Sequence, residues 1–206
     1  MKFNISTRAM TLVGLVALTL SSSLPSSASG NILLSGGNIA DSGADESFLT
    51  ALGYTYTYVS PSALSTTSFA GYSGIWLGWD TNYPGIASRQ GDIAAFAKAG
   101  GCVLAEMAYT NLGDLFPTVT SNFIGGGDNV NIVAAGDPIN SGLTNAGLSS
   151  WSNSYHSVFT SNGAYSVLTD TPDFSLPVTL GLGVGNGHIT LTGQDISYQH
   201  RTGCGN

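Results

Sequence analysis

The chain has 206 residues, of which only 8% are charged and 28 are glycine, and its formal net charge is −7. This charge balance argues against a nucleic acid or an anionic membrane as a partner, because both require clustered Lys and Arg to neutralise phosphates. The length suits one domain with a sizeable core.

Residues 1–29 are predicted to form a cleaved secretory signal peptide. Lys2 and Arg8 give a basic start, Met10–Leu20 is an apolar run, and a small-residue stretch ends at a site that suits signal peptidase. The apolar run is shorter than the about 20 residues that cross a bilayer, although a retained anchor is the alternative. We expect a secreted or periplasmic mature domain, residues 30–206, with a formal charge of −9 and no stable membrane association.

The first half of the mature chain alternates strand-like and helix-like segments. Short apolar runs end in glycine or polar residues, and the segments between them carry apolar residues at helical spacing with glycine stops. The expected strands are Asn31–Ser35, Tyr54–Val59, Gly74–Trp79 and Cys102–Ala105, and the expected helices are Asp41–Leu52 and Ile86–Ala99. This order predicts βαβ units and a mostly parallel sheet.

The second half contains strand-like runs without helices between them. These runs are Val130–Ala134, Ser157–Thr160, Tyr165–Leu168, Val178–Leu182 and His188–Thr192. Gly185-Asn186-Gly187 predicts a hairpin between the last two. Gly125-Gly126-Gly127 is interpreted as a flexible turn, because no helix or basic residue follows to make a phosphate loop. We therefore expect one α/β domain whose parallel sheet is extended by antiparallel strands.

Several phrases of the chain resemble the class I glutamine amidotransferase-like superfamily. They are Leu52-Gly53-Tyr54, Gly71–Leu77, Ala99-Gly100-Gly101 and the closing Gly187–Asp195. An Asp-Pro-Ile-x-x-Gly-Leu phrase at Asp137–Leu143 is similar to non-amidotransferase branches, such as trehalose-utilisation-like and other carbohydrate-associated domains. The resemblance implies a flavodoxin-like three-layer sandwich and does not transfer an activity.

The residues that carry glutaminase chemistry in that superfamily are missing here. Its amidotransferases have a cysteine at the sharp turn after the fourth strand and a His-x-Glu pair further on. In this chain the turn falls at Glu106-Met107-Ala108-Tyr109, Cys102 begins the strand instead, and no His-x-Glu is present. Without a thiolate and its base the covalent step has no chemistry behind it, so glutaminase activity is not expected.

The carboxyl edge of the sheet is the predicted site, because ligands bind there in doubly wound folds. The candidate ligand-binding residues are Gly36, Gly37, Asn38, Trp79, Tyr109, Gln194 and Asp195. Asp80 and Glu106 are candidates for a general acid/base pair, with His156 as a further base or ligand. No cofactor is expected, although the carboxylates of Asp80, Glu106 and Asp195 could hold a divalent cation if they converge.

Each candidate also has a purely structural interpretation. Asp80 fits a turn, Glu106 a hydrogen-bonded carboxylate at a strand end, Trp79 the core, and His156 a packed histidine. Three functions stay open: binding of a small or carbohydrate-type ligand or a protein partner, hydrolysis by Asp80 and Glu106, and a structural role in the envelope or matrix.

The two cysteines allow two interpretations. An oxidising compartment permits a Cys102–Cys204 disulfide, and the alternative is a buried Cys102 with a free Cys204 in the tail.

Overall fold

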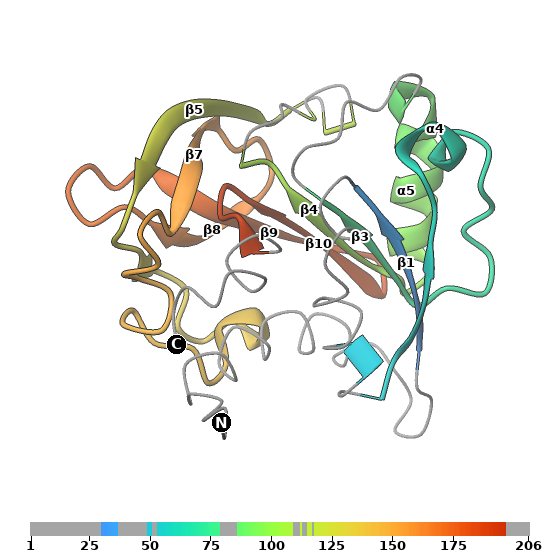
Figure 1. The fold of residues 1–206 in the computed structure, drawn as a ribbon, viewed down its shortest axis with the longest axis horizontal. Helices are drawn as coiled ribbons and strands as arrows, with labels where there is room; N and C mark the ends of the chain where they lie inside the picture. Colours follow the sequence, from blue (N-terminus) through green and yellow to red (C-terminus); the bar gives the residue numbers. More distant parts are fainter. Residues whose placement is uncertain are drawn as a thin grey trace, which may run out of the picture.

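A computed structural model describes residues 30–36, 49–50, 53–78, 86–108, 112, 115–116 and 118–196. Its main element is an eight-stranded sheet in the order β2-β1-β3-β4-β10-β9-β8-β6, accompanied by a two-stranded sheet of β5 and β7 (Figure 1). The strands are β1 Asn31–Ser35, β2 Thr55–Tyr58, β3 Gly74–Leu77, β4 Cys102–Glu106, β5 Thr120–Gly127, β6 Asn131–Ile132, β7 Tyr155–Ser161, β8 Ser166–Asp170, β9 Pro177–Val184 and β10 Gly187–Thr192.

The predicted parallel half of the sheet is confirmed. β1 pairs in parallel with β2 and β3, and β4 pairs in parallel with β3 and β10. One row of side chains crosses four strands in register, from Leu33 through Ile75 and Val103 to Ile189, and each of the four is buried. A strand that is covered on both faces is apolar at nearly every position. The strands of this half are therefore short apolar runs and do not alternate apolar with polar residues.

The antiparallel extension is also confirmed. β9 pairs with β10, β8 with β9, and β6 with β8, all antiparallel. Gly185 and Asn186 form the tight turn between β9 and β10, and Gly185 has a φ of 61° that suits glycine. A side chain at Gly187 would collide with the carbonyl oxygens of Ala97 and Gly101, so the hairpin lies directly against the end of α5.

The interpretation of Gly125-Gly126-Gly127 as a flexible turn is wrong. These glycines end β5, which pairs antiparallel with β7 across an irregularity between Phe123 and Gly127. Gly126 has a φ of 125°, and a side chain there would collide with Asn153. The glycine run is thus an irregular strand end that fits closely against its neighbours.

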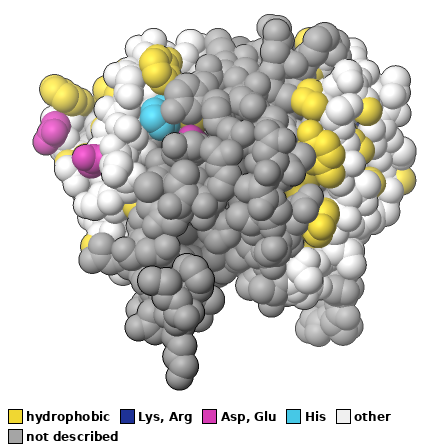
Figure 2. Space-filling view, viewed as in Figure 1, with side chains coloured by type: hydrophobic (Ala, Val, Ile, Leu, Met, Phe, Trp, Pro, Cys, Tyr) yellow, Lys and Arg dark blue, Asp and Glu magenta, His cyan; other side chains and the backbone are white. Residues whose placement is uncertain are grey.

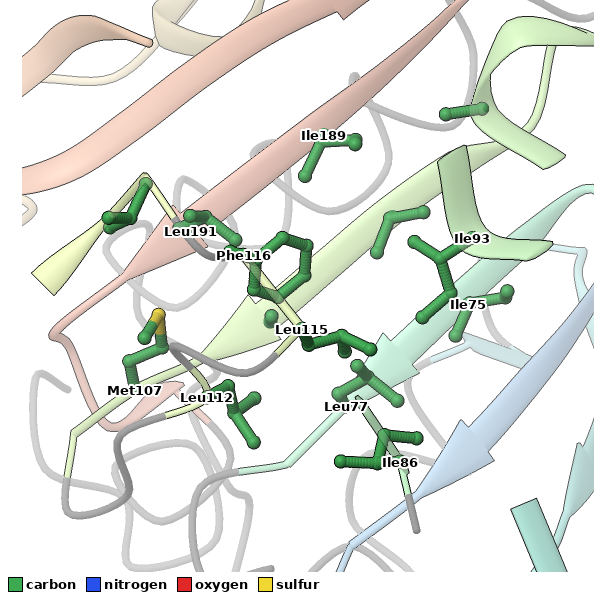
Figure 3. Packing of buried hydrophobic residues seen from close by; sticks show 14 of the residues in the cluster. Ile75, Leu77, Ile86, Ile93, Met107, Leu112, Leu115, Phe116, Ile189 and Leu191 are labelled. Atoms are coloured by element: carbon green, nitrogen blue, oxygen red, sulfur yellow. The ribbon is translucent and has the colours of Figure 1, made fainter. Parts of the chain in front are cut away.

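The 3-10 turn η1 and helix α5 cover one face of the main sheet, and Leu49 packs in the apolar cluster on the opposite face. The expected helix at 86–99 is present as a 3-10 turn η1, Ile86–Arg89, followed by α5, Gln90–Lys98. Figure 3 shows the apolar cluster beneath it, which includes Ile75 from β3, Ile93 from α5 and Phe116 from the segment between β4 and β5. Of the helix expected at 41–52, only residues 49, 50 are described, and both are helical.

A short helix that was not predicted from the sequence follows β2. α4, Pro61–Leu64, is capped by Ser60, whose Oγ accepts a 3.3 Å hydrogen bond from the Ala63 amide. Arg89 holds this region against η1, since its guanidinium donates to the Leu64 carbonyl at 2.7 Å and lies 4.2 Å from the Phe69 ring centroid. Ser60-Pro61 therefore ends the strand, as predicted, and also begins a helix.

Within these described segments, every helix is too short or too polar to traverse a lipid bilayer.

Candidate functional site

Five of the predicted site residues are described, and five lie outside the described residues. The described ones are Gly36, Glu106, His156, Gln194 and Asp195, and the others are Gly37, Asn38, Trp79, Asp80 and Tyr109. Gly36 directly follows β1 with a φ of 144°, a conformation that favours glycine. The predictions for Trp79, Asp80 and Tyr109 stay predictions.

Glu106 ends β4 as a fully buried carboxylate, with 0% of its surface exposed. The indole Nε1 of Trp76 on β3 donates a 2.7 Å hydrogen bond to its Oε1. Trp76 is in register with Leu104, so Trp76 and Glu106 are diagonal neighbours on one face of the sheet. A buried carboxylate needs such donors to offset lost hydration, and this contact matches the hydrogen-bonded strand-end interpretation.

The end of β10 adds a second set of buried polar groups beside Glu106. Thr192 is in register with Glu106, and its Oγ1 lies 3.1 Å from Oγ1 of Thr179 and accepts the Gln194 amide at 3.1 Å. Gln194 and Asp195 are 0% and 1% exposed. The carboxyl ends of β4 and β10 therefore bring Glu106, Gln194 and Asp195 into one buried polar region.

The predicted cation site gains no support from the described segments. They contain no group of three or more His, Cys, Asp or Glu placed to hold a metal ion. Asp80, the third member of the predicted set, lies outside them. A cation at Asp80, Glu106 and Asp195 thus stays a prediction.

β7 is held at this edge by hydrogen bonds to backbone carbonyl groups. The His156 amide donates to the Gly193 carbonyl at 2.9 Å, and Oγ of Ser157 donates to the Ala108 carbonyl at 2.6 Å. A side chain at Gly193 would collide with the Ser157 backbone, so only glycine permits the close approach. These bonds hold the β5–β7 sheet against the ends of β4 and β10 (Figure 1).

His156 is mostly buried, being 7% exposed, and stacks on Phe123 of β5. The ring centroids are 6.4 Å apart and the ring planes differ by 6°. Burial lowers the pKa of His156 below its usual 6.5, and a backbone hydrogen bond at Gly125 opposes this effect. The imidazole is therefore neutral at pH 7 and supports Phe123 as a packed ring.

Phe123 is a candidate site residue that was not predicted from the sequence. Its side chain is 54% exposed although it is aromatic, and Ile124 beside it is 42% exposed. We call the stacked pair of Phe123 and His156 the aromatic platform. The sequence signal for this residue is the apolar pair of Phe123 and Ile124 within a polar stretch, but the glycines that follow favour a turn.

The nucleophile turn of the amidotransferases contains no thiol among its described positions. Met107 and Ala108 follow β4, and both are buried. Cys102 is buried at the opposite end of the same strand. Cys204 lies outside the described residues, so the Cys102–Cys204 disulfide stays a prediction.

The described surface around these elements carries little positive charge. Figure 2 shows acidic side chains, and no Lys or Arg, among the coloured residues of this face. The two described basic residues, Arg89 and Lys98, belong to η1 and α5. An anionic ligand would therefore meet no basic side chain among the described residues of β5, β7 or the strand ends.

Comparison with solved structures identifies the fold. The cytoplasmic protein STM1381 from Salmonella typhimurium LT2 matches with a TM-score of 0.57 and 14% identity over 80% of this chain and 88% of its own. A glutamine amidotransferase from Thermotoga maritima matches with a TM-score of 0.55 and 11% identity over 83% of this chain and 77% of its own. This chain has the fold of a class I glutamine amidotransferase-like domain. No family model and no curated protein matches its sequence.

The same fold is present within larger glycosidases. A β-galactosidase from Rahnella sp. R3 matches with a TM-score of 0.51 and 16% identity over 86% of this chain but 30% of its own. An exo-β-1,4-mannosidase from Opitutaceae bacterium strain TAV5 matches with a TM-score of 0.52 and 9% identity over 84% of this chain and 32% of its own. At these identities the likeness concerns the fold alone.

Proposed function

We propose that the chain is an exported, catalytically degenerate amidotransferase-like domain that binds a carbohydrate-type ligand at the carboxyl edge of its sheet. The aromatic platform carries the proposal. Phe123 is 54% exposed, and a buried histidine stacks beneath it, so its ring is held in place before a ligand arrives. A rigid exposed ring is suited to the apolar face of a sugar, and pre-organisation reduces the entropy lost on binding.

The surroundings of the platform support a neutral ligand. His156 is uncharged at pH 7, and the described basic residues belong to η1 and α5. Hydroxyl-rich ligands need neither a phosphate-binding lysine nor a metal. The glycosidases that share the fold act on carbohydrates, which favours the same ligand class by analogy only.

A binding role fits the edge better than glutaminase chemistry does. Met107 and Ala108 occupy the start of the turn where the nucleophile would be expected, and Cys102 is at the other end of β4. Glu106 is enclosed and hydrogen-bonded to Trp76. Buried, hydrogen-bonded polar groups of this kind make the carboxyl edge of the sheet rigid, and β7 and the aromatic platform pack against it.

Phe123→Ala tests the proposal. Binding of the purified protein to a panel of insoluble and soluble polysaccharides is measured by sedimentation and by affinity electrophoresis. We expect the substitution to weaken binding tenfold or more, which corresponds to about 1.4 kcal/mol.

Phe174→Ala is the matched control. Phe174 is 78% exposed in the turn between β8 and β9 and is not part of the aromatic platform, so its removal should leave binding unchanged. Equal binding by the Phe123→Ala variant and the unmodified protein, or an equal loss in both variants, would reject the platform as the ligand site.

A further inference from the structure

A second concave site lies in the segment that follows β6. Residues from Ile132 to Asn145 line a pocket of about 740 Å³ that is open to solvent. We call it the 132–145 pocket. Phe123, His156 and Glu106 are not among its lining residues, so it is separate from the aromatic platform. Its volume lies within the range of small-molecule sites, about 300–1,000 Å³.

The walls of the 132–145 pocket carry neutral hydrogen-bonding groups and one carboxylate. The polar lining residues are Asp137, Asn140, Ser141, Thr144 and Asn145, and apolar patches come from Ile132, Pro138 and Leu143. Its lining includes no Lys or Arg. An anionic ligand would therefore meet the Asp137 carboxylate without a compensating cation.

Hydrogen bonds within the segment hold this pocket in shape. Asp137 Oδ1 accepts the Ile139 amide at 2.9 Å, and Asn145 Oδ1 accepts the Ile132 amide at 2.8 Å. Thr144 Oγ1 accepts the Gly147 amide at 3.0 Å. Each end of the loop is thus fixed by a side chain, and a ligand would find the pocket already formed.

The side-chain oxygen of Asn140 is a hydrogen-bond acceptor that the hydrogen bonds within the segment leave without a donor. The residue is 4% exposed, and its Nδ2 donates to the carbonyls of Ala134 at 2.9 Å and Leu168 at 3.2 Å. Two carbonyl partners assign the orientation of the amide, because a flipped oxygen would face both of them. Its Oδ1 has no hydrogen-bond partner within the described part of the chain.

The adjoining strand repeats this feature. Thr169 of β8 is in register with Ile132, which lines the pocket, and Thr169 is 2% exposed. Within the described ranges its Oγ1 also has no hydrogen-bond partner. Buried polar atoms are nearly always hydrogen-bonded, but Thr169 is not a lining residue, so only the unsatisfied Oδ1 of Asn140 belongs to a residue of the pocket.

We propose that the 132–145 pocket binds a neutral, hydroxyl-rich small molecule of the size of a mono- or disaccharide. A hydroxyl group both donates and accepts, so it complements the Asp137 carboxylate and the polar side chains of Ser141 and Asn145 with the same chemistry. The apolar patches of Ile132 and Leu143 suit the carbon skeleton of such a ligand. This site does not depend on the proposed function of the aromatic platform.

The test is a titration of the ¹⁵N-labelled protein, observed through the side-chain amide signals of Asn140 and Asn145. The probes are glucose, maltose and cellobiose, with inorganic phosphate as the anionic comparison. We expect saturable shifts of these amide signals with at least one sugar and none with phosphate. Shifts with phosphate alone, or no saturable shift with any sugar, would overturn the proposal.

Two alanine-to-tryptophan variants separate the pocket from the rest of the surface. Ala135→Trp places an indole at the pocket wall, where Ala135 is exposed, and should abolish the shifts. Ala95→Trp makes the same change on the exposed side of α5 and should retain them. Sugar-induced shifts that persist in Ala135→Trp at unchanged affinity would contradict the assignment.

Phe123→Ala distinguishes this site from the aromatic platform. The variant should bind these small sugars through the 132–145 pocket as the unmodified protein does, whatever happens to polysaccharide binding. A loss of the Asn140 and Asn145 shifts in Phe123→Ala would show that the two sites are one, and the proposal of a separate pocket would fail.

Discussion

Trp76 and Glu106 form a buried pair, in which the indole nitrogen donates a 2.7 Å hydrogen bond to the carboxyl oxygen. The two residues are 2% and 0% exposed, and they come from neighbouring strands. The pair connects the hydrophobic core to the carboxyl edge of the sheet. Trp76 packs in one of the two apolar clusters, and Glu106 is the last residue of β4.

Trp76→Phe should destabilise the protein by about 2–4 kcal/mol, since it removes a donor from a buried carboxyl group and also removes indole volume. Urea unfolding measures the change. Glu106→Gln is the comparison, because its amide oxygen can still accept from Trp76, and it should cost less than Trp76→Phe. A Glu106→Gln variant that also binds polysaccharide normally would exclude a role for the Glu106 charge in recognition.

Gly193→Ala should destabilise the protein by about 1–3 kcal/mol or more, because the added methyl group collides with the backbone of Ser157. It should also weaken platform-dependent binding, since β7 would be displaced. Gly183→Ala is the matched control, as a side chain at Gly183 would meet no heavy atom within 4 Å. Equal stability of the two variants would show that β7 does not depend on this close contact.

Stability should fall as the pH decreases below about 6.5, in part because of His188. Burial lowers the pKa of His188, and the nearby Asp137 carboxylate opposes this effect. The unfolded chain therefore binds a proton at about pH 6.5 while the folded histidine stays neutral, so acid favours unfolding.

The measurement is urea unfolding at intervals from pH 5 to 8 for the unmodified protein and for His188→Gln. The variant should lose less stability than the unmodified protein between pH 7 and 5. Parallel curves for the two proteins would show that His188 does not contribute to the acid sensitivity.

The predicted export of the protein can be tested by determining where the mature chain begins. If residues 1–29 are a signal peptide, the protein recovered from the extracytoplasmic fraction of its host begins at Gly30, which N-terminal sequencing or intact mass would show. Recovery of a protein that begins at Met1 in that fraction would contradict cleavage. Replacing Lys2 and Arg8 by glutamate should reduce export, because the basic start directs insertion.

The parallel half of the fold could be predicted because each of its central strands is an apolar run bounded by glycine or polar residues. Leu33, Ile75 and Val103 lie in such runs, and burial on both faces makes local composition sufficient. β5 could not be predicted in the same way. Its pairing with β7 involves residues more than thirty positions away, such as Phe123 with Ser157, and its glycines favoured a turn.

The candidate site was predictable in position and less so in chemistry. The rule for parallel sheets predicts that Glu106, Gln194 and Asp195 lie at one edge, and β4 and β10 do pair in parallel, whereas a ligand site at that edge stays a prediction. The contact between Trp76 and Glu106 depends on the two side chains lying on the same face of the sheet. The residue types alone do not predict which face each side chain occupies. The stacking of Phe123 on His156 depended on β5 and was missed with it.

The placement of Cys102 has a consequence for any attempt to install catalysis. Cys102 and Glu106 are the first and last residues of β4, and at about 3.3 Å per residue they are separated by about 13 Å along the strand. No substrate atom can be in bonding contact with both ends. An engineered nucleophile would belong in the turn that begins at Glu106, and alkylation of Cys102 would report on the amino end of the sheet while leaving the carboxyl edge unmodified.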